Sequence, residues 1–204
     1  MSEAAQSPMP VYADLAGAIF DCDGTLADTM PLHFRAWTAV LADYGAAMSE
    51  RLFYDLAGVP SVRIVEILNE RSGLRLNPAE IAREKEARYV TLLPEARPAA
   101  AVLTAVRAYR GQARLAVASG GLRALVEQTL VNLGIRELFD VIVTAEDVAR
   151  GKPAPDLFLL AAQRLGVPPA GCVVYEDAEL GLEAARSAGM RAVDVRPWLQ
   201  PPVN

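Results

Sequence analysis

Five short apolar runs are spaced along the chain, and none of them alternates apolar with polar residues. They cover positions 16–21, 113–119, 140–144, 172–176 and 190–195. Strands that are covered on both faces have this continuous apolar character, whereas half-exposed strands alternate. The runs therefore predict five strands of a mainly parallel sheet that is buried on both sides.

Segments with helical periodicity lie between these runs. Apolar residues recur every three or four positions over 122–133, 155–165 and 182–188, and each pattern ends at a glycine. The connections of 20 residues (120–139) and 13 residues (177–189) are long enough for helical crossovers between parallel strands. Strands that alternate with helices predict an α/β fold with a doubly wound, Rossmann-like sheet.

The first two predicted strands are separated by 91 residues (22–112), which is too many for one crossover. This stretch holds apolar stripes with helical spacing at 32–44, 64–68 and 78–93. We therefore expect an all-helical segment, 28–96, inserted after the first strand, with linkers near 27–30 and 94–98. The α/β core would then be discontinuous, at 11–27 and 97–198, and 1–10 and 199–204 are expected to be flexible tails.

The composition narrows the class of protein. At 204 residues the chain is long enough for one core and a small second unit. Its net charge of −5 argues against nucleic acid, whose phosphates attract basic surfaces. No apolar run reaches the roughly 18 residues of a membrane span, and the first ten residues lack the features of a secretory signal. We expect a cytoplasmic protein, monomeric by default, that binds neither nucleic acid nor membrane.

The chain contains two cysteines and one histidine. Cys22 and Cys172 lie in or beside apolar runs, as reduced core residues of a cytosolic protein do. A nucleophilic Cys22 would have only His33 to activate it. The single histidine also excludes a zinc site built from several histidines and disfavours a serine–histidine triad.

Polar residues with chemical function gather where four of the predicted strands end. In chain order they are Asp21, Asp23, Ser119, Gly120, Lys152, Glu176 and Asp177. In an open parallel sheet the carboxyl ends of the strands form one edge, and ligands bind there. Each motif alone is common as a turn, a surface loop or a helix cap. Their shared position at strand ends makes chance a poor explanation.

Clustered carboxylates with one lysine are costly unless a cation joins them. Oxygen ligands suit Mg²⁺, which often also binds a substrate phosphate. With the cation in place, Asp21 can stay ionised and act as a nucleophile. Repulsion between the two acids would let Asp23 carry a proton as a general acid/base. Ser119 and the amides of the two following glycines could hold a phosphoryl oxygen, and Lys152 would balance the remaining charge.

Four segments, DCDGT, ASG, GKPAPD and VVYEDAELGLEAA, resemble the four motifs of the haloacid dehalogenase superfamily. The resemblance runs from about residue 16 to residue 195. The inserted helical segment is similar to the cap of the β-phosphoglucomutase-like branch in ADTMPLHFRAW, LAGVPSVRIVEIL and AREKEARYV. Within this branch the chain most resembles phosphatases that act on fructose 1-phosphate and 6-phosphogluconate.

The resemblance also implies a role for each motif residue. Asp21 would be the nucleophile that forms an aspartyl-phosphate. Asp23 would be the general acid/base and would also give its backbone carbonyl to Mg²⁺. Asp177 would bind the metal directly, with Glu176 beside it. The transferring phosphoryl group would be held by Ser119, Gly120 and Lys152, and the metal ion by Asp21, Asp23, Glu176 and Asp177.

Three cap residues are candidates for contact with the substrate. His33 and Lys85 match positions where the mutases have a histidine and a lysine. Arg63 could also reach the substrate, but the mutase pattern has its arginine two positions earlier, where this chain has Ser61. Arginine grips phosphate bidentately and serine cannot, so this departure disfavours a second phosphate site.

The expected function is therefore Mg²⁺-dependent hydrolysis of small sugar phosphates, with β-phosphoglucomutase activity as the alternative. A dehalogenase would need neither Asp23 nor a metal ion. A non-catalytic phosphate-binding protein would be expected to lack at least one core carboxylate, and the chain has them all.

Overall fold

The computed structural model describes residues 8–199, and in this range five parallel strands form one sheet in the order β5-β4-β1-β6-β7. Their bounds are β1 Gly17–Phe20, β4 Arg114–Ala118, β5 Val141–Val143, β6 Cys172–Glu176 and β7 Arg191–Asp194. Each strand lies within one of the five apolar runs, so the predicted parallel sheet is confirmed. β1 is central and pairs in parallel with β4 and β6.

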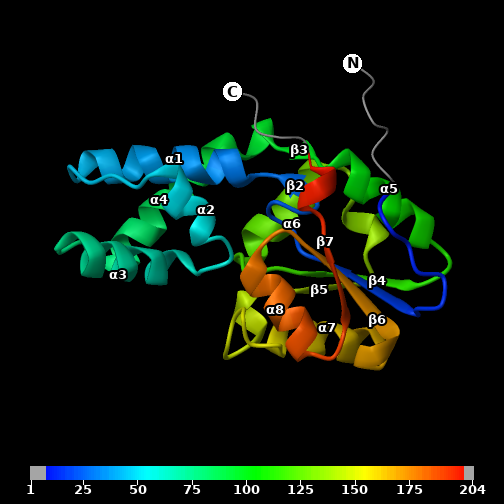
Figure 1. Cartoon of the computed structure of the whole chain (residues 1–204). Helices are drawn as coiled ribbons and strands as arrows, with labels where there is room; N and C mark the ends of the chain where they lie inside the picture. The colour runs from blue at the N-terminus through cyan, green and yellow to red at the C-terminus, as the bar shows by residue number, and fades with distance from the viewer. Residues whose placement is uncertain (1–7, 200–204) are drawn as a thin grey trace, which may run out of the picture.

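Helices cover both faces of this sheet (Figure 1). Ala18 and Phe20 of β1 point into the core under one pair of helices, and Ile19 points into the core under the other pair. All three side chains are completely buried. The first pair is α5 (Ala100–Tyr109) and α6 (Arg123–Asn132), and the second is α7 (Asp156–Leu165) and α8 (Glu179–Ser187). The doubly wound architecture is therefore confirmed.

The predicted helix ends at Gly134, Gly166 and Gly189 have φ values of 66°, 70° and 72°. This left-handed region favours glycine, which explains why each helical pattern stops there. Short 3₁₀ turns join several elements: η1 Leu93–Glu95, η2 Arg136–Leu138, η3 Ala145–Asp147, η4 Pro169–Gly171 and η5 Arg196–Trp198.

Four helices stand beside the sheet rather than on its faces (Figure 1). They are α1 (Met30–Asp43), α2 (Glu50–Asp55), α3 (Ser61–Ser72) and α4 (Pro78–Leu92). We refer to α1–α4 as the helical cap. Trp37, Leu41, Ile64, Leu68 and Ile81 form much of its own core. The inserted segment is helical, as predicted, and α2 is an additional helix.

The chain enters and leaves the cap through two short strands, β2 (Ala27–Asp28) and β3 (Arg97–Pro98). They pair antiparallel, with Ala27 opposite Pro98 and Asp28 opposite Arg97. These strands lie in the two predicted linkers. The proposed division into a core and a cap domain, with the boundaries given above, stays a prediction.

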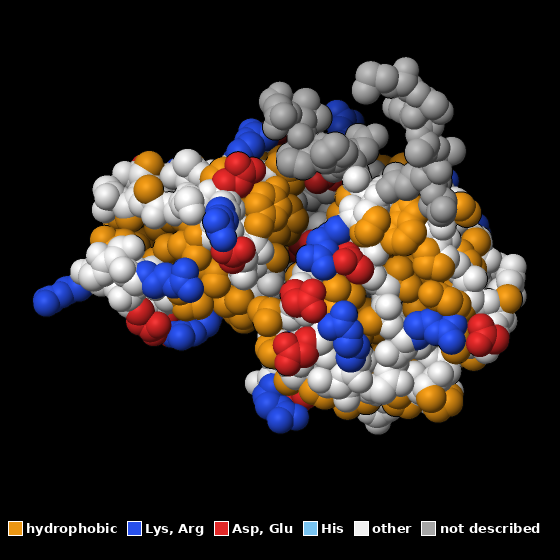
Figure 2. Space-filling model, viewed as in Figure 1, with side chains coloured by type: hydrophobic (Ala, Val, Ile, Leu, Met, Phe, Trp, Pro, Cys, Tyr) orange, Lys and Arg blue, Asp and Glu red, His pale blue; other side chains and the backbone are white. Residues whose placement is uncertain are grey.

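Within the part of the chain that the structure describes, no helix is long and apolar enough to cross a bilayer. Cys22 and Cys172 are buried free thiols. The predicted tails lie outside the described residues except for 8–10 and 199, and the carbonyl oxygen of Pro10 accepts a 2.6 Å hydrogen bond from the hydroxyl of Tyr175. On the face drawn in Figure 2, basic and acidic side chains of the described residues are interspersed.

Candidate active site

The polar residues predicted at the strand ends come together at one edge of the sheet. A cavity of about 500 Å³ lies there, between the sheet and the cap. This volume is typical of small-molecule sites, which span about 300–1,000 Å³. The candidate residues that line it are Asp21, Asp23, Ser119, Gly120, Lys152, Glu176 and Asp177 from the core, and His33 and Lys85 from the cap.

Lys152 joins two carboxylates at the base of the cavity. Its Nζ donates 2.6 Å hydrogen bonds to Oδ1 of Asp21 and to Oε2 of Glu176, and all three residues are buried. The other oxygen of Glu176 accepts the N–H of Ala178 at 3.1 Å. Burial opposes the charge of Lys152, but Asp21 and Glu176 raise its pKa, so it is an ammonium at neutral pH.

Asp177 completes a group of three acids with Asp21 and Glu176, whose nearest oxygen atoms all lie within 4.8 Å of one another. Burial and the charge of Glu176 raise the pKa of Asp21 well above its ordinary value, and they raise the pKa of Asp177 to about 7. If all three acids ionise, they and the Lys152 ammonium carry two negative charges in sum, which one divalent cation would neutralise.

The donor set also fits a hard cation. Thr25 donates a 2.8 Å hydrogen bond to Oδ1 of Asp177 and thereby orients its carboxylate. Oδ2 of Asp21 accepts no hydrogen bond from the described residues and is available as a ligand, and the carboxylate of Asp177 lies within reach of the same ion. Oxygen donors of this kind are those that Mg²⁺ takes in proteins. The group therefore fits Mg²⁺, with Asp21 and Asp177 as side-chain ligands and Glu176 beside them.

Gly24 brings the loop after β1 against Asp177. Its φ is +85°, and a Cβ at this position would lie 2.3 Å from Oδ2 of Asp177. Any residue with a side chain would therefore be strained and would displace the carboxylate. This close approach explains why the motif DCDGT has glycine between its second aspartate and Thr25.

The side chain of Asp23 is not part of the acid group and bonds to residues at the start of the cap and within it. Its Oδ1 accepts hydrogen bonds from Thr29 Oγ1 at 2.7 Å, from His33 Nε2 at 3.2 Å and from the Tyr89 hydroxyl at 3.3 Å. Burial alone would raise its pKa, but His33 and Thr29 lower the pKa of Asp23 to about 2. These contacts outweigh the effect of burial and favour the carboxylate form of Asp23 in this arrangement. The role of Asp23 as a general acid/base stays a prediction.

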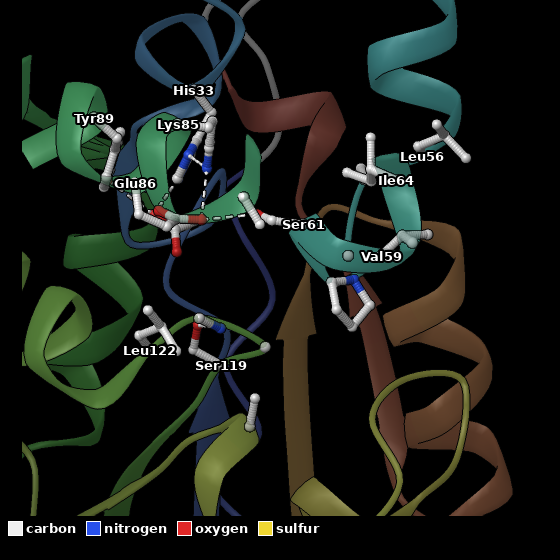
Figure 3. Close-up of a pocket in the computed structure, with 18 of the residues that line it drawn as sticks. His33, Leu56, Val59, Ser61, Ile64, Lys85, Glu86, Tyr89, Ser119 and Leu122 are labelled. Atoms are coloured by element: carbon white, nitrogen blue, oxygen red, sulfur yellow. Dashed lines mark hydrogen bonds and ion pairs between the residues drawn. The ribbon is translucent and has the colours of Figure 1, made fainter. Parts of the chain in front are cut away.

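His33 connects Asp23 to Lys85, and Figure 3 shows the two cap side chains in contact. Nζ of Lys85 lies 2.8 Å from Nδ1 of His33. Because an ammonium only donates, Nδ1 is the acceptor and Nε2 carries the ring proton toward Asp23. Burial and the charge of Lys85 lower the pKa of His33, so the ring is neutral at pH 7. It stacks on the ring of Tyr89, with 3.8 Å between the centroids.

Ser119 is held in place by its neighbours. Its N–H donates to the carbonyl of Val143 and its Oγ accepts the N–H of Gly121, both at 3.0 Å. Of the two glycine amides expected to face a phosphoryl oxygen, only that of Gly120 has no partner among the described residues. The Ser119 hydroxyl and the Gly120 amide are thus the donors left for an anion.

Arg63 does not line the cavity, contrary to the prediction. Its guanidinium binds Glu66 at 2.9 Å and Glu70 at 3.0 Å, and its side chain is 49% exposed. Ser61 lines the cavity instead and donates a 2.7 Å hydrogen bond to Oε1 of Glu86. Two residues along a helix turn the side chain by about 200°, so Ser61 and Arg63 face different directions.

Several residues of the site were not marked as candidates in the sequence. Thr25 and Thr29 follow Asp23 by two and six positions, and a hydroxyl so close to a predicted carboxylate cluster is a signal that identifies them in retrospect. Glu86 and Arg83 line the cavity from α4. Their direction depends on how the helix is rotated, which the apolar stripe alone does not specify.

Known proteins share this arrangement over most of the chain. Residues 15–189 match the model of the haloacid dehalogenase-like hydrolases. Fructose-1-phosphate phosphatase YqaB of Escherichia coli (strain K12) is 43% identical over 186 residues, which are 91% of this chain and 99% of that protein. A mutant of CbbY from Rhodobacter sphaeroides in complex with xylulose-(1,5)bisphosphate superposes with a TM-score of 0.75 at 34% identity, covering 87% of this chain and 84% of that chain.

A third similar structure is β-phosphoglucomutase from Clostridium difficile. It superposes with a TM-score of 0.77 at 27% identity, covering 88% of this chain and 84% of that chain. The family match covers more than three quarters of the sequence, and the fold described above agrees with it. The chain therefore belongs to the haloacid dehalogenase-like hydrolase family.

Proposed function

We propose that this chain is a Mg²⁺-dependent phosphatase that hydrolyses small sugar phosphates, of the fructose 1-phosphate or 6-phosphogluconate type, through an aspartyl-phosphate intermediate. The observation that carries the proposal is the cluster of Asp21, Lys152, Glu176 and Asp177 at the base of a cavity that the cap covers. Similarity to a fructose-1-phosphate phosphatase over nearly the whole chain supports the substrate class.

The reaction has two displacements at phosphorus. In the first, an oxygen of Asp21 bonds to phosphorus while the bond to the sugar oxygen breaks, and Asp23 gives that oxygen a proton. In the second, water bonds to phosphorus, the bond to Asp21 breaks, and Asp23 takes the proton that the water loses. Burial alone would raise the pKa of Asp23, but its contacts with His33 and Thr29 lower it, which favours the carboxylate that acts as the base of the second step. Before the first step Asp23 has to take up a proton from solvent, and it regains that proton from the attacking water in the second step.

The other residues bind and neutralise the phosphoryl group. Lys152 lies against Asp21, where the phosphoryl group has to arrive, and Ser119 with the Gly120 amide offers donors on the adjoining strand end. Mg²⁺, when bound by Asp21, Asp177 and the Asp23 carbonyl with Glu176 beside them, supplies further positive charge. In phosphoryl transfer such positioning and charge stabilisation provide most of the rate.

The alternative is a phosphosugar mutase, which the presence of His33 and Lys85 favours. A mutase must also hold the second phosphate of a sugar bisphosphate. Ser61 stands at the position expected for that anchor, and it is bonded to the carboxylate of Glu86. A negative charge at this place favours hydrolysis over mutase chemistry.

Asp21→Asn tests the proposal, because an amide cannot attack phosphorus in this way. We expect phosphate release from hexose phosphates in Mg²⁺ to fall at least about 10³-fold, as removal of a covalent nucleophile does, with an unchanged circular dichroism spectrum. Rapid-quench trapping should find a phosphorylated parent enzyme and no phosphorylated variant. Hydrolysis at the parent rate by the variant would contradict the assignment. Isomerisation of β-glucose 1-phosphate, run in parallel, would reveal a mutase.

A further inference from the structure

We propose that Glu86 selects the substrate, because one of its carboxylate oxygens accepts hydrogen bonds from sugar hydroxyls and its charge excludes a second anionic group. The preferred substrate is then a sugar monophosphate with an uncharged end, rather than a sugar bisphosphate or the phosphate of a sugar acid. Of the two substrate types proposed above, this inference keeps fructose 1-phosphate and disfavours 6-phosphogluconate. This inference rests on the proposed phosphatase function and states which sugar phosphates the enzyme prefers.

Glu86 is held in a defined position on the cap side of the cavity. Its Oε1 accepts from Ser61 Oγ at 2.7 Å and from Lys85 Nζ at 3.0 Å. The two donors come from different helices, α3 and α4, so the carboxylate cannot swing away without breaking both bonds. Figure 3 shows Glu86 beside Lys85 and Ser61, across the cavity from Ser119 of the core.

The second oxygen of Glu86 is unused. Oε2 accepts no hydrogen bond from the described residues, and a fifth of the side chain is exposed in the cavity. The cap side of the cavity also has apolar lining residues, such as Leu56, Val59 and Ile64. A carboxylate oxygen in such a place is a strong acceptor, and the hydroxyls of a sugar are matching donors.

The same position is unfavourable for an anion. A phosphate or carboxylate placed against Oε2 would meet a like charge that is only partly solvated, and its own water shell would be lost. Lys85 pairs with Oε1 of Glu86 at 3.0 Å and offsets part of this charge, whereas Oε2 has no cationic partner among the described residues. Arg83 is a second basic cap residue among those that line the cavity, and it is exposed, so that water and salt screen its charge.

Glu86→Gln tests the proposal because the amide keeps the size and removes the charge. The readout is the ratio of kcat/KM for fructose 1-phosphate to kcat/KM for fructose 1,6-bisphosphate, with 6-phosphogluconate as a third substrate. The substitution could also disturb Lys85, which is bonded to Glu86. If that lowers kcat/KM for all substrates by the same factor, the ratio does not change. We expect the ratio to fall roughly tenfold, the effect of one hydrogen bond to a charged group. The same preference should appear in calorimetric dissociation constants measured in the Asp21→Asn background.

Two variants serve as matched controls. Glu84→Gln makes the same chemical change on the same helix, but Glu84 bonds to Tyr44 and does not line the cavity. It should leave the ratio within twofold of the parent. Ser61→Ala removes one of the donors that hold Glu86 and should lower the ratio by less than Glu86→Gln does.

The outcomes separate the two proposals. An unchanged ratio in Glu86→Gln, or an equal change in Glu84→Gln, would overturn the role of Glu86. A change of the ratio in Arg83→Gln but not in Glu86→Gln would also overturn it. If the parent releases phosphate from none of these esters in Mg²⁺, the proposed phosphatase function itself fails.

Discussion

At the scale of single residues, close contacts around the acid group leave little freedom for substitution. Gly181 of α8 is the clearest case after Gly24, since a Cβ there would lie 2.2 Å from the carboxylate of Glu176. The glycine thus gives Glu176 the space in which it binds Lys152 and the Ala178 amide. The absence of a side chain at Gly181 thus determines where the carboxylate of Glu176 can lie.

Gly181→Ala is expected to lower kcat/KM for a sugar phosphate on the order of 10²-fold, because a displaced Glu176 no longer holds Lys152 against Asp21. The stability of helix α8 should not fall, because alanine favours the helical conformation by about 1 kcal/mol over glycine. Gly151→Ala is the control, because its Cβ would meet nothing within 4 Å although Lys152 follows it directly. Parent-like turnover of Gly181→Ala, with a retained fold, would contradict this account.

At the scale of elements, the strands were predictable and the helix orientations were not. Each strand is a buried apolar run, and burial on both faces leaves a signal that needs no knowledge of its neighbours. α2 has only six residues, too few for a helical period to stand out. The directions of Arg63, Ser61 and Glu86 depend on the rotation of α3 and α4, which packing against other helices determines.

The carboxylate of Asp147 connects η3 with helices α6 and α7 near the site. Asp147 ends η3 and accepts hydrogen bonds from the N–H and hydroxyl of Thr144, at 2.8 Å and 3.2 Å. It also pairs with Arg123 of α6 and, at 3.0 Å, with Arg164 of α7. Burial alone would raise its pKa, but the Thr144 and arginine contacts lower the pKa of Asp147 to about 2.

Asp147→Asn should reduce the free energy of unfolding by about 1–2 kcal/mol at pH 7, where the carboxylate is ionised in both states. A lowered native pKa stabilises the fold above the ordinary pKa of 3.8, and this contribution is lost as the pH falls toward 2. The difference between parent and variant should therefore shrink from pH 7 to pH 3 in urea titrations.

Asp55→Asn controls for the charge change in this experiment. Asp55 is exposed on α2 and makes no side-chain hydrogen bond or ion pair with the residues that the structure describes. Its variant should stay within about 0.5 kcal/mol of the parent at both pH values. A pH-independent difference for Asp147→Asn would show that the arginine pairs contribute nothing.

At the scale of the whole molecule, the site is complete only when distant parts of the chain meet. Asp21 comes from the first eighth of the sequence, whereas Lys152 and Glu176 come from the last third. This convergence could be predicted, because parallel strands bring their carboxyl ends to one edge. The walls of the cavity could not, since they depend on how the cap packs over that edge. The domain boundaries, the cytoplasmic location, the monomeric state and the lack of nucleic-acid or membrane partners stay predictions.

Mg²⁺ should stabilise the whole fold, since an ion that binds only the native state shifts the unfolding equilibrium. At 100 times its dissociation constant the gain is about 2.7 kcal/mol, which raises the melting temperature of a chain of this size on the order of 5–10 °C. Differential scanning fluorimetry with MgCl₂, against NaCl of equal ionic strength, measures it. Asp177→Asn should lose most of the shift. Equal shifts in parent and variant would place the ion elsewhere.

Asp21 and Asp23 are two residues apart, yet different parts of the molecule hold them. Asp21 depends on Lys152 of the core, whereas Asp23 depends on Thr29 at the entry to α1, His33 of α1 and Tyr89 of α4. A rotation of α1 and α4 about the paired β2 and β3 would therefore break the hydrogen bonds that His33 and Tyr89 donate to Asp23. The hydrogen bond between Asp21 and Lys152 would remain. Because Asp23 transfers a proton in both steps, each step would require α1 and α4 to lie over the substrate.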